Sequence, residues 1–471
     1  EPLQVIPGPI IARWTPLWLA FQARRGRRYL AVNQLHIKYG PVVRIAPRHF
    51  SIADPTAIDI VYAQGKFALD KSRFYDAFVA GSPSVFSTTS RAEHSRKRKL
   101  ISHAFYKDSL EDCAALMQDI VHIFVNKLDE ISRQSQSVNI LQWFHLLSFD
   151  ILSDLAFGKR IGMIDQGSDV VIVESLGGKV TQEHAISLVD EREHLAAVNG
   201  LVPWLRCLSS FIPDPFFVRG RKSSHGLVDL SRREIMDRLQ SGLQRPDILQ
   251  RLIDAYKVDS DQLGPESLGE LIADVVTLLI AGSDTTSNSI AAIIYLIVTN
   301  PKVHKKLLAF LEEAVHETNP NYEEVKSIPY LDAVIDEGLR YHATAAIGLH
   351  RRVPDGGVMC CGHYFPAGTE LSIPGWTIQH DKTLWGDPEV FRPERWIEDP
   401  SLRKYFMTFG KGPRACVHSL AYMEMRLILA TIVLRYNIKT AMGHMKTTEG
   451  FMHKPKELIV QLSPRDRTGN L

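Results

Sequence analysis

Apolar side chains recur at intervals of three and four residues over most of the chain, which is the pattern of amphipathic helices. Residues 109–131, 141–155, 303–315 and 331–339 show this pattern, and another apolar helix is expected from His418 to Tyr436. The longest apolar stretch runs from Leu271 to Thr299, and Asn300-Pro301 marks its end. These segments predict a mainly α-helical fold.

Two shorter regions favour β structure. One is Val42–Ile52, with a turn at Pro47, and the other is Arg352–Pro374, with turns at its glycines. Residues 158–224 show weak periodicity and contain three prolines, so this stretch is interpreted as helices joined by mobile loops. No linker, repeat or low-complexity tract divides the 471 residues, which predicts one large domain with a small β-rich region.

Composition narrows the class of protein. A hydrophobic content of 45% supports a large core, and a net charge of +2 argues against nucleic acid as a main partner. The five cysteines are scattered and show no paired C-x-x-C zinc spacing, so their usage fits a reducing compartment.

No segment stands out as a membrane span. The stretch Leu271–Thr299 is interrupted by Asp274 and by the polar run Ser283–Asn288, which indicates a buried helix of the core. The chain starts at Glu1 without methionine, and Pro7-Gly8-Pro9 indicates a stiff hinge. Such a hinge fits a position just after a removed membrane anchor, and a plain surface loop would look the same.

Cys416 ends the glycine-rich segment Phe409–Cys416, just before an apolar helix. The partial positive charge at a helix N-terminus lowers the pKa of a thiol and favours the thiolate. A thiolate on haem iron promotes O–O cleavage. A single cysteine beside an apolar helix also fits a buried packing residue, so both interpretations remain open for Cys416 alone.

The middle of the long apolar helix carries Ala281-Gly282-Ser283-Asp284-Thr285-Thr286, whose polar residues are poor choices for a core helix. Serine and threonine can donate to the carbonyl one turn earlier and open the helical ladder. The pattern predicts a groove with a proton donor and room for a small molecule. A polar contact between two helices is the alternative.

Two charged motifs complete the set. Glu337 and Arg340 share one helix face, with Arg395 as a possible third member. His94 and Arg98 share a face of a basic segment and can hold one anion together. An exposed ion pair and a solvated charge run are the plainer alternatives.

These elements occur in a fixed order: His-x-x-x-Arg, Ala-Gly-x-Asp-Thr-Thr, Glu-x-x-Arg with Pro-Glu-Arg, and Phe-x-x-Gly-x-Arg-x-Cys. Together they resemble the cytochrome P450 family of haem-thiolate monooxygenases, from about Tyr39 to Tyr436. The resemblance implies the mainly α cytochrome P450 fold, with residues 1–471 as a single catalytic domain.

The resemblance also implies roles for the motif residues. Cys416 is expected to ligate the iron of heme b, with Phe409 packed near its sulfur. Propionate binding is expected of four residues: His94, Arg98, Arg351 and Arg414. Asp284 and Thr285 are expected to be catalytic, as a proton relay for dioxygen. A structural ion cluster is expected of Glu337, Arg340 and Arg395.

A closer similarity links the chain to the fungal benzoate para-hydroxylase group. It is carried by segments such as Arg44–Pro47, Phe74–Phe78 and Leu279–Asn288. This implies hydroxylation of benzoate or a related benzenoid. Candidate substrate contacts, from segments that border the family's pocket, are Arg73, Tyr75, Ala281, Thr344 and Ile347. Arg73, Tyr75 and Thr344 could donate to a carboxylate, although such side chains are mostly surface or structural residues.

Two positions depart from the family pattern. His418 stands where glycine is usual, and it could distort the loop, contact a propionate or face the reductase. His350 stands where proline is usual before the arginine, in a segment that borders the pocket.

No flavin or nicotinamide fingerprint is evident, so the resemblance implies electrons from a separate NADPH-cytochrome P450 reductase. A basic docking face is expected from Lys97, Lys99, Arg403, Lys404 and Lys411. The expected location is the cytosolic face of the endoplasmic reticulum membrane. The alternatives are a fungal secondary-metabolite P450 that oxidises a larger aromatic or terpenoid scaffold, and a haem-binding sensor without oxygen chemistry.

Overall fold

The computed structural model describes residues 2–63, 68–102, 105, 107–134, 136–257 and 263–465. Most of this chain is helical, as the apolar periodicity predicts. The longer helices are α1 (Leu17–Arg24), α2 (Arg28–Tyr39), α4 (Arg91–Ser102), α5 (Lys107–Arg133), α6 (Ile140–Phe157), α8 (Ala185–Leu201), α10 (Pro215–Ser241), α11 (Ile248–Tyr256), α12 (Pro265–Thr299), α13 (Pro301–Ala314), α15 (Pro329–His342) and α19 (Ser419–Arg435).

Short helical segments connect these elements. They are α3 (Ile58–Val61), η5 (Arg73–Phe78), α7 (Met163–Gln166), α9 (Pro203–Leu208), η7 (Ser209–Phe211), α14 (Tyr322–Val325), α16 (Gly375–Gln379), α17 (Lys382–Trp385), α18 (Arg395–Glu398), η8 (Pro400–Tyr405) and η9 (Gly412–Arg414). Near the N-terminus lie η1 (Pro2–Val5), η2 (Ile10–Arg13) and η3 (Pro55–Ala57).

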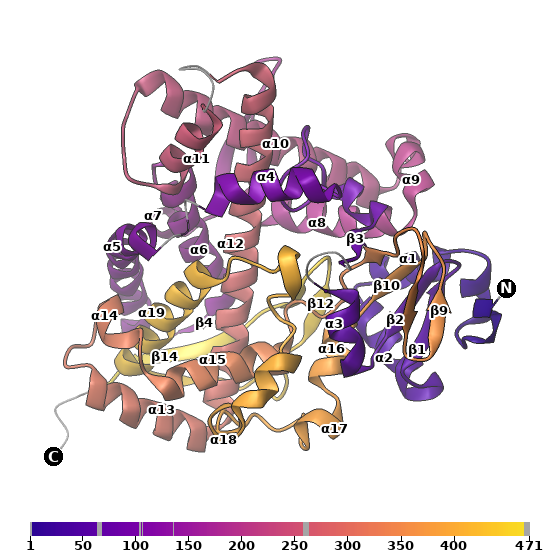
Figure 1. The fold of residues 1–471 in the computed structure, drawn as a ribbon. Coiled ribbons are helices and arrows are strands. Elements are labelled where there is room, and N and C mark those ends of the chain that lie inside the picture. Colours follow the sequence, from indigo (N-terminus) through magenta and orange to yellow (C-terminus); the bar gives the residue numbers. More distant parts are fainter. Residues whose placement is uncertain are drawn as a thin grey trace.

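The main sheet has five strands in the order β1 (Val42–Ala46), β2 (His49–Ile52), β10 (Glu370–Ser372), β7 (Arg351–Arg352) and β3 (Asp70–Lys71). Strands β2 and β10 pair in parallel, which brings an N-terminal hairpin against a segment more than three hundred residues later. Figure 1 shows this as indigo beside orange ribbons, near the N-terminus. Both predicted β regions are therefore confirmed.

The remaining strands form small sheets. One has the order β11 (Tyr436–Lys439), β14 (Ile459–Pro464) and β4 (Ser137–Asn139). The others are the pairs β5 (Val170–Glu174) with β6 (Val180–His184), β8 (Val358–Cys360) with β9 (His363–Phe365), and β12 (Thr447–Glu449) with β13 (His453–Pro455).

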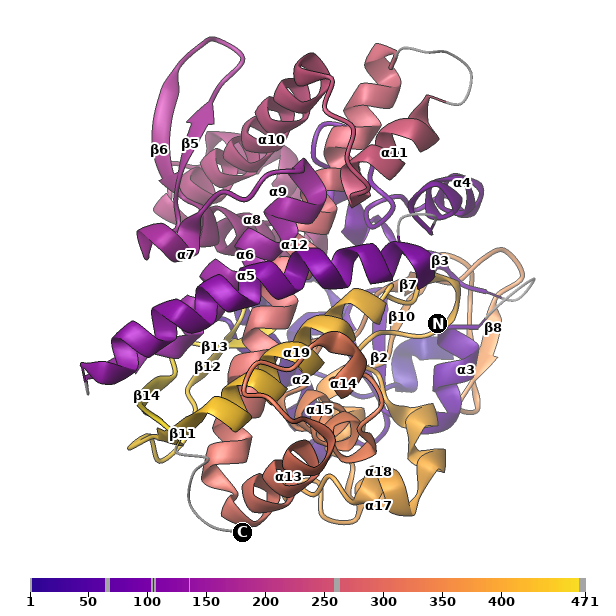
Figure 2. The same ribbon diagram turned by 90° about the vertical axis from the view of Figure 1, so that its left-hand side faces the viewer.

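The prediction for residues 158–224 is wrong in one respect. It misses the hairpin β5–β6, which Figure 2 shows as a projecting arm beside α10. Val170-Val171-Ile172-Val173 and the glycines 177 and 178 carry a strand–turn signal that the prolines further along obscure. The rest of this stretch includes the long helix α8 and the start of α10.

Helix α12 crosses the middle of the molecule in both views, with α6 packed against it. A Cβ atom on Gly282 would lie 2.7 Å from Leu152 Cδ1, so this glycine is what allows α6 to approach α12. Helix α6 is the one helix of the described residues long and apolar enough to span a membrane, yet 89% of it is buried inside the protein. It is a core helix.

The segment Pro7-Gly8-Pro9 packs on the main sheet. The amide of Arg44 donates to the carbonyl of Pro7 at 2.8 Å, and a Cβ on Gly8 would lie 2.2 Å from the Arg44 carbonyl oxygen. This glycine is needed for that close contact, and the segment is docked on β1.

Candidate active site

A cavity of about 280 Å³ lies between α12 and the loop that carries Cys416. Helix α4 contributes His94 and Arg98 to its wall, and α12 contributes Ala281, Gly282 and Thr285. Apolar side chains cover much of the remaining wall, among them Val85, Phe86, Leu152, Leu278 and Phe451. Three of the four sequence motifs, which are far apart in the chain, therefore meet around one space.

Cys416 faces this cavity from a tight loop. Its amide donates to the carbonyl of Phe409 at 2.8 Å, and Gly410 and Gly412 turn the chain with φ angles of 68° and 72°. A Cβ on Gly412 would lie 2.1 Å from the Tyr62 carbonyl oxygen. Both this close contact and the positive φ angle require glycine at position 412. The loop places Cys416 in the cavity wall, and the residue is exposed to that space.

The helix start does not by itself produce the predicted thiolate. Helix α19 begins at Ser419, and burial raises the pKa of the Cys416 thiol to about 11, although the Arg98 charge lowers it. A metal cation at the sulfur removes the proton outright. The sulfur therefore fits an iron ligand, and its thiolate form depends on the bound metal.

Four cationic side chains surround the same space, and we call them the cationic belt: Lys71, Arg98, Arg351 and Arg414. Lys71, Arg98 and Arg414 line the main cavity, while Arg351 and Arg414 line an adjoining cavity of about 220 Å³. Among the described residues, no ion pair joins a member of the belt to a carboxylate.

The belt is electrostatically strained by its own charge. Burial and the charge of Arg351 lower the pKa of Arg414 to about 10, and burial with the charges of Arg351 and Arg414 lowers the pKa of Lys71 well below its ordinary value. Burial and the belt likewise lower the pKa of His94 to about 3. A bound dianion would relieve this repulsion, so the two propionates of a haem fit the site.

Backbone contacts fix the belt in place. Arg98 donates to the carbonyl of Ala415 at 3.0 Å, which ties α4 to the cysteine loop. Arg414 donates to the carbonyl of Thr88 at 2.8 Å, and Arg351 donates to its neighbour's carbonyl and to the Tyr75 hydroxyl at 3.4 Å.

Lys71 is a site residue that the sequence did not indicate. It lies in the two-residue strand β3, its ammonium donates to the Phe86 carbonyl, and it sits 4.0 Å from the ring centroid of Tyr75. A lone lysine between ordinary residues gives no motif, and only the pairing of β3 with β7 brings it beside Arg351.

The polar turn of α12 is continuous helix. Thr285 donates to the carbonyl of Ala281 at 2.5 Å, and Ser283 donates to that of Leu279 at 2.6 Å, so the predicted back-bonding is present. The expected opening of the helical ladder is wrong, because α12 runs unbroken from Pro265 to Thr299. Thr285 nevertheless faces the cavity.

Asp284 does not line the cavity. Its carboxylate accepts from Asn288 at 3.0 Å and pairs with Lys454 on β13 at 3.4 Å. Lys454 also pairs with Asp190, whose side chain is 42% exposed. Burial lowers the pKa of Lys454, but the two carboxylates outweigh it and raise that pKa. The charged groups of Asp284, Lys454 and Asp190 thus form a row that leads from the residue next to Thr285 toward solvent.

The candidate substrate contacts separate into two sets. Ala281 and Thr344 line the cavity. Arg73 is exposed and Tyr75 is buried behind the wall, and neither lines the cavity. Ile347 lines a different small cavity beside the main sheet. The last three are therefore not placed to contact a molecule in the main cavity.

Glu337, Arg340 and Arg395 form a fully buried cluster, with exposures of 0%, 0% and 1%. Glu337 accepts from Arg340 Nε and Nη2 at 2.9 Å each, from Arg395 Nε at 3.1 Å, and from the Trp396 indole at 3.0 Å. The cluster lies apart from the cavity and joins α15 to α18, which is a structural arrangement.

Two more residues singled out from the sequence have a definite place. His418 is exposed, its ring lies against Phe409 with centroids 4.9 Å apart, and it lines neither cavity. Of the alternatives left open for it, the structure favours the outward-facing position. Lys97 is only 1% exposed and pairs with Glu270 at 2.7 Å, so it cannot belong to a basic docking face.

Comparisons with known proteins agree with this geometry. The sequence model of the cytochrome P450 family matches residues 7–462. Benzoate 4-monooxygenase of Aspergillus niger is 39% identical over 98% of this chain and 93% of its own. A pisatin demethylase of Fusarium vanettenii is 30% identical over 94% and 86%, and a Penicillium brasilianum P450 monooxygenase is 28% identical over 99% and 94%. The chain belongs to the cytochrome P450 family.

Proposed function

We propose that this P450 monooxygenase hydroxylates a small aromatic acid, benzoate or a related benzenoid, on its ring. The similarity to a benzoate 4-monooxygenase over nearly the whole chain is the observation that carries the proposal. The cavity agrees with it, because apolar and aromatic side chains such as Leu152, Phe86 and Phe451 suit a benzene ring.

Heme b, held by Cys416 and the cationic belt, would supply the redox chemistry that splits dioxygen and delivers one oxygen atom to the substrate. The residues of the chain then serve three tasks: ligation, proton delivery and substrate placement. Thr285 lies on the cavity wall, and its hydroxyl would pass a proton to dioxygen. Asp284, Lys454 and Asp190 would resupply it from solvent through their ion pairs.

Thr344 is the hydroxyl best placed to hold a substrate carboxylate. Its Oγ1 lies 3.0 Å from Ser289 Oγ, and Ser289 already donates to the carbonyl of Thr285 at 2.8 Å. Because the Ser289 proton is occupied, the Thr344 hydroxyl donates to Ser289 Oγ. It would turn that proton toward a substrate carboxylate, which is the stronger acceptor.

The experiment compares binding of benzoate and of uncharged toluene by their shift of the haem spin state. A hydrogen bond to a charged group contributes about 1.5–3 kcal/mol, so Thr344→Val should weaken benzoate binding by about 10–100-fold and leave toluene nearly unchanged. Thr277→Val is the matched control, since Thr277 also lines the cavity but donates to the carbonyl of Ala273 at 2.9 Å. Equal weakening of both ligands would reject the carboxylate role.

A wild-type protein that shows no spin shift and no ring hydroxylation with benzoate, yet shifts with bulkier aromatics, would favour a secondary-metabolite substrate. The similarity to a pisatin demethylase is the observation behind that second candidate.

Electrons would come from an NADPH-cytochrome P450 reductase at a basic face made of Lys99, Arg403, Lys404 and Lys411. Lys99, Arg403 and Lys404 are exposed, and Lys411 is half-buried in the cysteine loop. Neutralising the three exposed residues should slow reduction of the haem as raised salt does. Unchanged reduction rates would exclude this face.

An apolar face near the N-terminus supports a place on the endoplasmic reticulum membrane. Trp14, Phe21, Trp204 and Phe211 are 82%, 55%, 54% and 84% exposed. The pair Arg24–Asp214, 2.6 Å apart, brings α1 beside the start of α10, which follows η7. Trp14→Ser with Phe211→Ser should reduce sedimentation with phosphatidylcholine vesicles, and unchanged sedimentation would refute the contact.

A further inference from the structure

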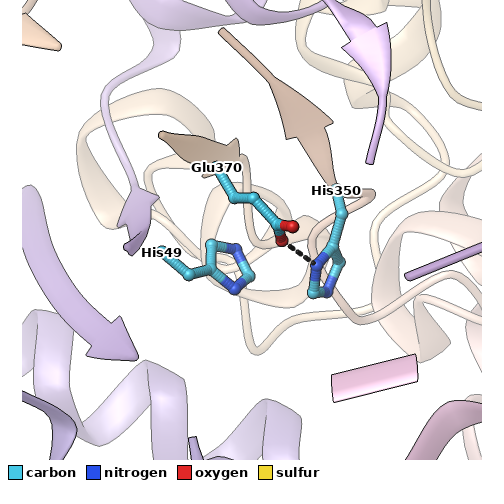
Figure 3. A group of neighbouring side chains, drawn as sticks. All are labelled: His49, His350 and Glu370. Atoms are coloured by element: carbon cyan, nitrogen blue, oxygen red, sulfur yellow. Dashed lines mark hydrogen bonds and ion pairs between the residues drawn. The ribbon is translucent and has the colours of Figure 1, made fainter. Parts of the chain in front are cut away.

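Three metal-ligating side chains meet in the main sheet, apart from the active-site cavity: His49, His350 and Glu370. His49 on β2 and Glu370 on β10 are direct cross-strand neighbours, and His350 immediately precedes β7. One nitrogen or oxygen from each lies within 4.8 Å of the others. Figure 3 shows the three side chains converging from their strands on one space.

The surroundings hold these groups in position. The Nδ1 atom of His350 lies 3.1 Å from Glu370 Oε2, and Nε2 of His49 lies 2.8 Å from Ser372 Oγ. The ring of Phe74 stacks on His350 with centroids 4.1 Å apart and an interplanar angle of 10°. A tetrahedral Zn²⁺ needs ligand atoms at about 2.0–2.2 Å from the metal, so the three atoms would have to move closer together when the ion binds.

The three side chains offer two imidazole nitrogens and one carboxylate oxygen as donor atoms. Neutral imidazole and ionised carboxylate are the forms that bind a metal. Arg28 from α2 and the arginines of β7 are the other charges that face the group.

A small cavity of about 20 Å³ adjoins the two histidines, with Arg28, Ser51 and Ser372 in its wall. This space holds about one water molecule. Both Nη atoms of Arg28 are buried and, among the described residues, have no hydrogen-bond partner, while its Nε donates to Glu449 at 2.8 Å. A metal-bound water or hydroxide in this cavity would accept from the guanidinium, which explains how a cation and Arg28 can be neighbours.

We propose that His49, His350 and Glu370 bind one zinc ion, with water as the fourth ligand. Two imidazoles and one carboxylate are the donor set that Zn²⁺ takes, whereas Ca²⁺ and Mg²⁺ prefer sites made of oxygen atoms. The site is structural, because its cavity admits water and nothing larger. The ion would join β2, β10 and the residue before β7. Because His350 directly precedes Arg351, the ion would also restrict the position of this member of the cationic belt.

The test uses the haem-loaded protein after dialysis against a chelator. Cys360 and Cys361 have sulfur atoms 3.8 Å apart and are a competing thiol pair, so every measurement is made in a Cys361→Ser background. Zinc is then added, the bound metal is counted by mass spectrometry, and the affinity is measured by calorimetry. We expect one zinc ion per chain and a higher melting temperature.

The variants His350→Ala and Glu370→Gln should each weaken zinc binding by at least about 100-fold, because loss of an outer-shell partner alone typically costs 10–100-fold. His184→Ala is the matched control. His184 pairs with Asp169 at 2.7 Å on an exposed strand, so it offers a histidine–carboxylate pair without a third ligand. Its removal should leave the zinc content unchanged.

A protein without bound zinc, or zinc binding that both ligand variants leave unchanged, overturns the proposal. The reduced carbon monoxide spectrum checks that each variant keeps its haem site. If a variant fails that check, anomalous scattering at the zinc edge from crystals of the unaltered protein decides, and a peak anywhere but between these three side chains counts against the site.

Discussion

Replacing Glu337 with glutamine tests how much one buried carboxylate stabilises this fold. Its two oxygens accept five hydrogen bonds: Oε1 from Arg340, Arg395 and the amide of Arg392, and Oε2 from Arg340 and Trp396. In glutamine an NH₂ group replaces one of the two oxygens. Whichever oxygen is replaced, at least two donors then face a group that cannot accept a hydrogen bond. At about 1.5–3 kcal/mol for each charge-assisted bond, the loss begins near 3 kcal/mol.

Removing one partner of a buried pair typically costs about 3–5 kcal/mol, which agrees with this figure. The expected decrease in the free energy of unfolding is therefore about 3–5 kcal/mol. Urea unfolding is followed by tryptophan fluorescence and by the Soret band together, because a large protein with a cofactor need not unfold in one step.

Glu398→Gln is the control. Glu398 pairs with Arg392 at 2.6 Å but is 59% exposed, so its loss should cost no more than about 1 kcal/mol. Equal effects of the two substitutions would show that burial does not strengthen the Glu337 cluster, and the reasoning would fail.

Three further predictions concern the cavity. Cys416→Ser should abolish the thiolate-type haem spectrum, and its survival would mean another axial ligand. Thr285→Ala should divert electrons from product to peroxide or water, which lowers the amount of product formed per NADPH consumed. An unchanged ratio would contradict the role of Thr285 in proton transfer. Burial raises the pKa of Glu424 to about 8, although Ser148 donates to it. The folded chain then keeps a proton that the unfolded chain loses, so stability should fall by about 1.4 kcal/mol per unit between about pH 4.5 and 8. Glu424→Gln should flatten that slope in urea titrations at several pH values, and an unaltered slope would assign it to other groups.

Much of the fold follows from local pattern. The predicted helix 331–339 is the centre of α15, which extends to Pro329 because proline suits a first helical turn. It ends at His342, and the next residue, Ala343, caps it in the left-handed region with a φ of 49°, which an alanine in the sequence does not indicate. That the chain is one domain stays a prediction.

Site residues that belong to a sequence motif could be predicted from the sequence. Site residues that come together only because distant segments meet in the fold could not. Cys416, Arg98 and Thr285 belong to motifs, and the structure brings them to one cavity. Lys454 lies 170 residues from its partner Asp284, and no local pattern records such a pairing. Lys71 and the cross-strand pair His49–Glu370 likewise depend on sheet register, which forms between segments far apart in the chain.

The cationic belt makes haem a partner in folding. Its four members come from β3, α4, β7 and the cysteine loop, and they must converge against their mutual repulsion. A ligand that binds only the folded chain stabilises it by about 2.7 kcal/mol when its free concentration is 100 times its dissociation constant. The yield of intact protein in a producing cell should therefore follow the supply of haem during synthesis, and porphyrin-starved cells should accumulate aggregated chain.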